Sequence, residues 1–282
     1  MSSKRFKAQI LIEQEIGCSD PAQLAVDKVL FKKKIESLQV SDALIVRLEE
    51  ATASDAADTF FKALLSIVEA LDSIARGGHS WAIVKLYYSA FYLLRCRMAG
   101  FNHVFFKCAG NIYSVELVKN STPVLRSKGK FRGSDIRGDH KTIIATYVNN
   151  FAPNDILLSN TIEQISVFEW MMSAREEINY RSPDFVEPLL GHFDKALFSS
   201  EGLAYWVNKY LRDPTLVHCF LRDHCCLATP LVLARDVLSG YIGRFNRRPI
   251  ESDQAEFLGS RLNSIFSGSN DFHDLVLASA DS

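Results

Sequence analysis

The sequence lacks a net charge that would draw the whole molecule toward one kind of partner. Its 32 lysine and arginine residues nearly balance 33 aspartate and glutamate residues, which leaves a formal charge of −1. A field this weak does not attract nucleic acid or a membrane surface to the molecule as a whole. Any such attraction must therefore come from a local patch.

The chain also lacks a long apolar run and a convincing secretory signal. Its most apolar stretch, Trp81–Leu94, is interrupted by Lys85 and is too short to cross a bilayer. The first residues contain no small-residue cleavage site after an apolar segment. Six cysteines without an export signal favour free thiols in a reducing compartment. We therefore expect a cytoplasmic protein that does not bind a membrane.

Three familiar catalytic patterns are absent: the P-loop G-x-x-x-x-G-K-[ST], the nucleophile elbow G-x-S-x-G and the zinc motif H-E-x-x-H. The sequence therefore gives no support for a P-loop nucleotide-binding protein, a serine hydrolase or a zinc metalloprotease. A single cluster of potential metal ligands, His218, Cys219, His224, Cys225 and Cys226, lies within an apolar helical pattern. Zinc sites usually combine two ligand pairs at fixed spacing. We therefore expect buried thiols here, with no metal and no other cofactor.

Apolar residues recur at three- and four-residue spacing through most of the chain, as is typical of helices. Ala8–Ile16 fits either a short strand or an amphipathic helix, whereas Phe101–Lys141 shows no periodicity and is expected to be irregular. We predict helices over Pro21–Val40, Ser41–Ala53, Ser54–Ile74, Ser80–Ala99, Lys141–Asn149, Asn160–Arg181, Phe185–Leu197, Gly202–Leu211, Thr215–Leu227, Pro230–Phe245 and Asp253–Phe266.

The predicted fold class is all-α, an antiparallel helical bundle with additional C-terminal helices. A capping-box pattern at Asn160 and Glu163 predicts the start of one bundle helix. We divide the chain into an N-terminal segment, 1–53, that packs on the bundle, a central helical domain, 54–188, and a C-terminal helical extension, 189–282.

Two segments of the central domain carry a resemblance to a known family. One predicted helix contains WAIVKLYYSAFYLLR, with paired aromatic residues, and a later one ends in AREEINYRSP. In this order they resemble the HEPN domain, a helical bundle common in prokaryotic ribonuclease toxins and defence proteins. The family motif is an arginine followed a few residues later by a histidine, often preceded by asparagine. Here Arg175 and Asn179 match, and Tyr180 stands in the histidine position.

The resemblance implies a homodimeric, metal-independent endoribonuclease with Arg175, Asn179 and Tyr180 at its cleft. The arginine would stabilise charge on the phosphoryl oxygens, and the motif histidine would move protons as the RNA 2′-hydroxyl attacks. Tyrosine, with a reference pKa of about 10, is a poor base at neutral pH. A second hypothesis is therefore a non-catalytic HEPN-like subunit that binds RNA, a nucleotide or a protein partner such as an antitoxin. A third is an unrelated helical scaffold.

One basic patch lies within the aperiodic region, in the segment RSKGKFRGSDIRGDHK. Its six cations oppose only Asp135 and Asp139, which leaves about four net positive charges. We predict that the patch contacts RNA or a nucleotide, with Phe131 stacking on a base. The alternative is a solvated loop. The candidate RNA-binding residues are Arg126, Lys128, Lys130, Arg132, Arg137 and His140, with Lys141 as the sixth cation of the segment.

Two other arginine–histidine pairs have the motif spacing, Arg97–His103 and Arg212–His218. Chance alone predicts roughly 1.3 such matches in a chain of this composition, so the spacing is weak evidence. Gly100 interrupts the first pair. The second has Asp213 after the arginine, as many HEPN motifs do, but Pro214 follows. Arg212–His218 is therefore a reserve candidate.

Overall fold

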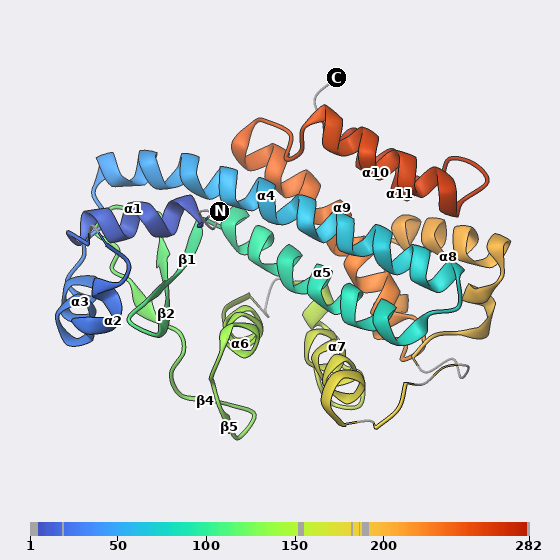
Figure 1. The fold of residues 1–282 in the computed structure, drawn as a ribbon, viewed down its shortest axis with the longest axis horizontal. Helices are drawn as coiled ribbons and strands as arrows, with labels where there is room; N and C mark the ends of the chain where they lie inside the picture. The colour runs from blue at the N-terminus through green and yellow to red at the C-terminus, as the bar shows by residue number, and fades with distance from the viewer. Residues whose placement is uncertain are drawn as a thin grey trace.

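The protein is mainly helical, with one small antiparallel sheet and a separate two-stranded hairpin (Figure 1). The structure, a computed structural model, describes residues 5–18, 20–151, 155–181, 183–185, 187 and 192–280, without the side chains of residues 200 and 201. The helices are α1 (Lys7–Glu15), α2 (Gln23–Val26), α3 (Lys28–Glu36), α4 (Asp42–Ala75), α5 (His79–Gly100), α6 (Asp139–Phe151), α7 (Val167–Glu176), α8 (Ser200–Arg212), α9 (Cys225–Phe245), α10 (Ser252–Ile265) and α11 (Asp271–Ala278).

The centre of the fold is a bundle of the long helices α4, α5 and α9. A short turn reverses the chain between α4 and α5, so these two helices run antiparallel through the molecule (Figure 1). Gly77 makes this turn with a φ of +81°, a conformation that glycine adopts without strain. The Tyr241 hydroxyl of α9 donates to the Ala53 carbonyl of α4, and Arg244 donates to Asn102 beyond the end of α5. The predicted helical bundle is confirmed at this level.

Helix α5 owes its central position to its composition. Apolar and aromatic residues surround it almost completely, and most of them are buried. A helix that is hydrophobic all round must be covered on all sides, which α4, α9, α6 and α7 do. The predicted end of this helix at Gly100 is confirmed.

Helix α4 is one continuous element where the sequence pattern suggests two. The Ser41 hydroxyl accepts from the Leu44 backbone N–H and caps its first turn. The helix then passes through Ser54 without interruption. The predicted domain boundary near residue 54 therefore falls within a helix, and the division into domains remains a prediction.

Helix α9 is long and apolar enough to span a bilayer by length and composition, and 72% of its most apolar window is buried within the protein. The core helix of a helical protein has the same character. The cytoplasmic location remains a prediction.

Part of the region expected to be irregular forms strands. The sheet has the order β1 (His103–Cys108), β2 (Asn111–Glu116), β3 (Val124–Leu125) and is antiparallel. Ala109 and Gly110, with φ of +50° and +80°, make the two-residue turn that pairs Cys108 with Asn111. Helices α1 and α3 pack against this sheet in a second, smaller core. The prediction of an all-α fold is therefore wrong in this region. Of the two alternatives for Ala8–Ile16, the helix is the one formed, as α1 over Lys7–Glu15.

Several predicted helix boundaries are also wrong. Helix α7 begins at Val167, not at Asn160, because the capping box is formed by Ser166 and Glu169. Thr215–Leu227 is a short 3-10 turn followed by the first residues of α9, and α11 lies in a segment with no predicted helix. Residues 186 and 188–191 of the predicted helix Phe185–Leu197 lie outside the described residues, and its end forms a 3-10 turn over Lys195–Phe198.

Candidate functional site

Arg175 lies in the last turn of α7, on the side that faces α5. The capping box fixes the start of this helix: the Ser166 hydroxyl accepts from the Glu169 N–H, and the Glu169 carboxylate accepts from the Ser166 N–H. A single π-helical turn, Glu177–Arg181, follows α7. Such turns are frequent at functional sites. This turn ends at Arg181, which is where the sequence predicts the end of the helical segment.

The Arg175 side chain is buried, and none of the described residues supplies it with a carboxylate partner. It is 9% exposed, and its Nη2 donates to the Tyr88 hydroxyl at 3.4 Å. Its guanidinium carbon lies 5.3 Å from the centre of the Tyr87 ring and 5.7 Å from that of Tyr88. Its Nε has no hydrogen-bond acceptor and no ion pair involves it within the described residues. Buried arginines are normally paired with an anion, so this one is free to bind an anionic ligand.

The other two residues of the predicted catalytic motif lie differently. Tyr180 is 74% exposed, although the Arg175 guanidinium lies 5.4 Å from the centre of its ring. Asn179 is half-buried, and neither Asn179 nor Tyr180 lines the cavity beside Arg175. Both residues stand in the π-helical turn, where the angular spacing differs from that of an α-helix. The structure therefore brings only Arg175 of the three to this cavity.

His140 stands beside Arg175 against the same pair of tyrosines. It belongs to the first turn of α6, and its Nδ1 lies 2.9 Å from the Tyr87 hydroxyl oxygen. Its ring packs 4.2 Å from the Phe91 ring and 5.3 Å from the Tyr88 ring, centre to centre. The paired tyrosines of α5 thus contact Arg175 and His140, which are far apart in the sequence.

A cavity of about 410 Å³ is lined by both Arg175 and His140. Its walls come from the β4–β5 hairpin, the start of α6 and one face of α7. In that hairpin, β4 (Lys130–Phe131) pairs with β5 (Ser134–Asp135), and Arg132 and Gly133 form the turn at positive φ. The volume is in the range of small-molecule and nucleotide sites. The residues that line it are Phe131, Arg132, Ser134, Arg137, Gly138, Asp139, His140, Lys141, Ile165, Glu169, Met172, Ser173, Arg175 and Glu176.

Two of the cations that line this cavity have no carboxylate partner in the part of the chain that the structure describes. Arg137 pairs with Asp135 beside the cavity. Arg175 and Lys141 have no ion pair with any residue of the described ranges. The cavity therefore presents unbalanced positive charge to a ligand. Each acidic lining residue is already paired: Asp139 with Lys107 at 2.5 Å, Glu169 with Arg132 at 2.5 Å and Glu176 with Arg181 at 3.3 Å.

The predicted RNA-binding residues divide into two groups. Arg132, Arg137 and His140 line the cavity, as does Lys141. Arg126 instead donates from Nε to the Ser114 hydroxyl at 2.7 Å in the sheet, and Lys128 and Lys130 are exposed outside the cavity. The Phe131 ring is largely buried but lines the cavity, and its stacking on a base stays a prediction. The sequence reasoning did not include Glu169, whose S-x-x-E pattern with Ser166 marks the start of α7.

Burial sets the protonation of the groups around His140. Desolvation lowers the pKa of His140, the nearby Arg175 lowers it further, and Asp139 partly opposes the shift. Burial raises the pKa of Tyr87 far above its ordinary value, so its hydroxyl keeps its proton. Burial lowers the pKa of Arg175, but its hydrogen bond to Tyr88 and the neighbouring tyrosines outweigh this effect and raise it. At neutral pH the site therefore holds a charged guanidinium beside a neutral imidazole.

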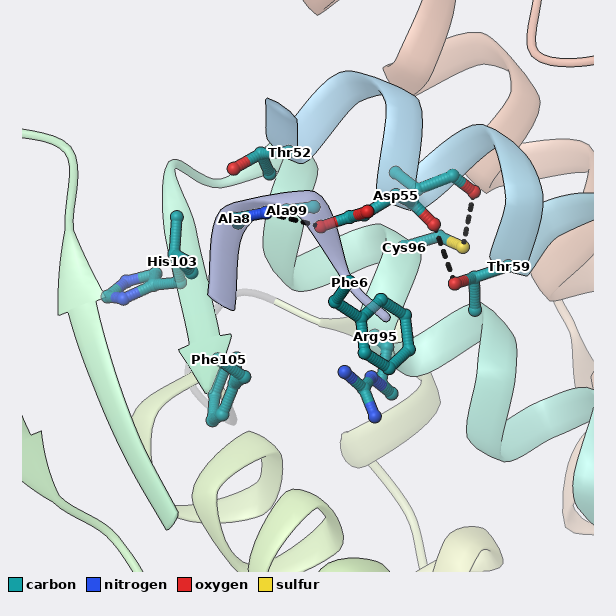
Figure 2. A pocket seen from close by; sticks show the side chains of 12 residues that line it. Phe6, Ala8, Thr52, Asp55, Thr59, Arg95, Cys96, Ala99, His103 and Phe105 are labelled. Carbon is teal, nitrogen blue, oxygen red and sulfur yellow. Dashed lines mark hydrogen bonds between the residues drawn. The ribbon is translucent and has the colours of Figure 1, made fainter. Parts of the chain in front are cut away.

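Other candidate sites are less suited to a ligand. The pocket in Figure 2, between α1, α4, α5 and β1, holds only about 40 Å³, and Asp55 there accepts from the Ala8 N–H at the start of α1. In the reserve pair, Arg212 is bound to Asp271 at 2.6 Å and His218 Nδ1 lies 3.0 Å from Asp213. Arg212 and His218 nevertheless line the same cavity of about 500 Å³, beside α8.

The Arg97–His103 pair and the histidine–cysteine cluster make contacts that stabilise the fold. Arg97 pairs with Asp155 at 3.3 Å, whereas His103 begins β1 and packs edge-on against Phe151. The cysteines of the metal-like cluster are buried free thiols. Across the described residues no three histidine, cysteine, aspartate or glutamate side chains gather as metal ligands.

Comparison with known proteins gives no relative for this arrangement of residues. No protein-family model matches the chain, and no curated protein or solved structure matches it significantly.

Proposed function

We propose that this protein is a HEPN-like RNA-binding protein whose Arg175 cavity holds a phosphate of the RNA backbone. The observation that carries the proposal is the buried Arg175 guanidinium, which has no carboxylate partner in the described structure and faces a cavity with further cations. The planar guanidinium fork matches the geometry of a phosphate and stays charged at all physiological pH values.

The cations around Arg175 can contact further phosphates of the bound RNA backbone. Lys141 has no ion-pair partner among the described residues, and Arg132 and Arg137 lie at the hairpin side of the cavity. Single-stranded nucleic acid is commonly bound in a positive groove that follows the phosphates. A chain with a net charge of −1 needs such a local field, because its global field gives no attraction.

The reaction that fits this site is metal-independent cleavage of RNA, in a defence or toxin system, as the HEPN resemblance implies. Arg175 is placed to stabilise negative charge that grows on the phosphoryl oxygens. The proposal includes a homodimer that pairs two such cavities and a protein partner that restrains the activity. The dimer and the partner follow from the resemblance, whereas the phosphate site is supported by the contacts of Arg175.

A second candidate is a non-catalytic subunit that binds RNA without cutting it. The specific observation in its favour is Tyr180, which stands in the histidine position of the motif and is exposed. A protonated phenol can donate a hydrogen bond to phosphate but is a weak base.

The test is RNA binding and cleavage by wild-type protein, Arg175→Ala and the control Arg47→Ala, with EDTA present. Arg47 lies in α4 outside the cavity and is exposed, where it pairs with Glu15. Affinity for a fluorescent single-stranded RNA should fall at least about tenfold in Arg175→Ala, since a charge-assisted contact is lost. Arg47→Ala should change it less than about threefold. Equal loss in both variants, or no RNA binding by the wild type, would overturn the proposal.

A further inference from the structure

We infer that His140, in the first turn of α6, is the group that accepts the proton of the attacking 2′-hydroxyl. This inference rests on the proposed function and deepens it, because it assigns a catalytic residue to the cavity and a reaction to the bound RNA. It moves the proton-transfer role away from Tyr180, which the motif spacing designates. The geometric basis is that His140 and Arg175 line one cavity and pack on one pair of tyrosines.

The ring of His140 is held in place from two sides. Phe91 packs against it, and the Tyr87 hydroxyl contacts its Nδ1 at 2.9 Å. When Nδ1 carries the proton and donates to Tyr87 Oη, the lone pair is on Nε2, the nitrogen without a partner within the described ranges. This tautomer is the one that can accept a proton from a substrate. Tyr87 is then a positioning residue, because it orients the ring and does not exchange the substrate proton itself.

The surroundings keep the imidazole neutral, so one ring nitrogen is available to accept a proton. Four charged groups on four elements act on it: Arg175 on α7, Lys107 on β1, Arg95 on α5 and Asp139 on its own helix. Three of these are positive, and the backbone N–H groups at the start of α6 add a further positive potential. Tyr87 and Tyr88, which also face the ring, are uncharged hydroxyl groups at neutral pH. A neutral histidine beside a charged arginine is the pairing that base catalysis on a phosphodiester requires.

The proposed cleavage of the RNA backbone needs only these two side chains and water. Nε2 of His140 takes the proton of the 2′-hydroxyl as the 2′-oxygen forms a bond to phosphorus. The bond between phosphorus and the 5′-oxygen breaks, and that oxygen takes a proton from water. The products are a 2′,3′-cyclic phosphate and a free 5′-hydroxyl. Arg175 offsets the negative charge on the phosphoryl oxygens throughout, and the imidazolium of His140 returns its proton to solvent.

The first measurement is the single-turnover rate of cleavage of a 5′-labelled single-stranded RNA, with protein in excess and EDTA present. The second is the affinity of the protein for a 2′-deoxy analogue of the same RNA, which cannot be cleaved. The variants are His140→Ala, Tyr87→Phe and His218→Gln, the last being the matched control because His218 belongs to the reserve pair and lines another cavity. Excess protein separates chemistry from binding. Far-UV circular dichroism and thermal melting show whether each variant is folded.

The expected result has three parts. His140→Ala keeps its affinity for the 2′-deoxy RNA within about threefold while its cleavage rate falls about 10²- to 10⁴-fold, the usual contribution of a general base. Added imidazole restores part of the rate, which a purely structural role of His140 would not allow. Tyr87→Phe lowers the rate less than His140→Ala, and His218→Gln leaves it within about threefold.

Other results overturn the inference. If the wild-type protein binds RNA but does not cut it, the inference about His140 is wrong and the proposal of RNA binding stands. A cleavage rate in His140→Ala within about tenfold of the wild type, or a loss in His218→Gln equal to that in His140→Ala, places the base elsewhere. A folded His140→Ala protein that imidazole fails to rescue assigns the residue a structural role. Failure of the wild type to bind any RNA defeats the proposed function itself.

Discussion

Arg132 and Glu169 form an ion pair, with 2.5 Å between Nε and Oε1, that joins the β4–β5 hairpin to the first turn of α7. Nη1 of Arg132 also donates to the Gln164 carbonyl at 3.0 Å. Glu169 is buried, so the pair masks a carboxylate that would otherwise repel a phosphate in the cavity. The hairpin and α7 are thus held together by the same residues that set the charge of the site.

We expect Arg132→Ala to weaken RNA binding more than Lys128→Ala does. The first change removes a cation and unmasks Glu169, whereas Lys128 is an exposed cation of the same segment outside the cavity. Fluorescence anisotropy across a salt series measures this, and each lost phosphate contact lowers the salt slope by about 0.7. The double variant R132A/E169Q should recover part of the affinity. No recovery would show that the masking of Glu169 is unimportant.

We predict that Tyr180→Phe changes RNA affinity and cleavage by less than about twofold, because the Tyr180 side chain is exposed and outside the cavity. Tyr88→Phe should weaken phosphate binding more, since the Tyr88 hydroxyl accepts the one hydrogen bond that Arg175 makes within the described structure. Titration of each variant with the same RNA compares them. A large effect of Tyr180→Phe would restore Tyr180 to the site.

The stability of the protein should fall as the pH drops below about 6.5, the ordinary pKa of histidine. Burial lowers the pKa of His103, His140, His192 and His224 in the folded state. The unfolded chain then binds more protons than the folded one between the folded pKa values and about 6.5, so the free energy of unfolding decreases with decreasing pH there. Urea denaturation at several pH values measures it, and His140→Gln should flatten the dependence. Stability that rises on acidification would contradict these pKa directions.

Tyr113→Phe should stabilise the protein by up to about 1 kcal/mol, since it removes a buried polar group that has no compensating hydrogen bond. Tyr113 in β2 is fully buried, and its hydroxyl finds no hydrogen-bond partner in the part of the chain described. Tyr147→Phe is the opposite control, because the Tyr147 hydroxyl donates to the Asp155 carboxylate and its loss should cost about 1.5–3 kcal/mol. Urea unfolding monitored by circular dichroism gives both values. Destabilisation by Tyr113→Phe would mean that its hydroxyl is satisfied in solution.

The sequence predicts the helical bundle well because the buried face of α4 imposes a period that can be counted. Helix α5 is apolar almost all the way round, and the glycines at residues 77, 78 and 100 mark its two ends. The β1–β2 hairpin was not predicted, since six-residue strands produce only a short pattern. Its Ala109–Gly110 turn lacks the asparagine or aspartate that usually marks such a hairpin.

Arg175 could be predicted as a catalytic residue, whereas its neighbour His140 could be predicted as an RNA-binding residue of the basic segment. What joins them is the packing of α6 and α7 on the same two tyrosines of α5, a tertiary relationship between residues 140 and 175. The direction of Tyr180 could not be predicted from helical periodicity either. The π-helical turn after α7 changes the angle between successive side chains.

The six free cysteines are all buried and divide between the two cores: Cys18 and Cys108 lie in the core of α1, α3 and the sheet, and Cys96, Cys219, Cys225 and Cys226 lie in the core of the long helices. A thiol reagent can reach them only when the surrounding structure opens. Labelling of these thiols therefore measures local unfolding without any engineered cysteine. The rate at which each thiol is labelled reports separately how often the sheet end and the bundle open.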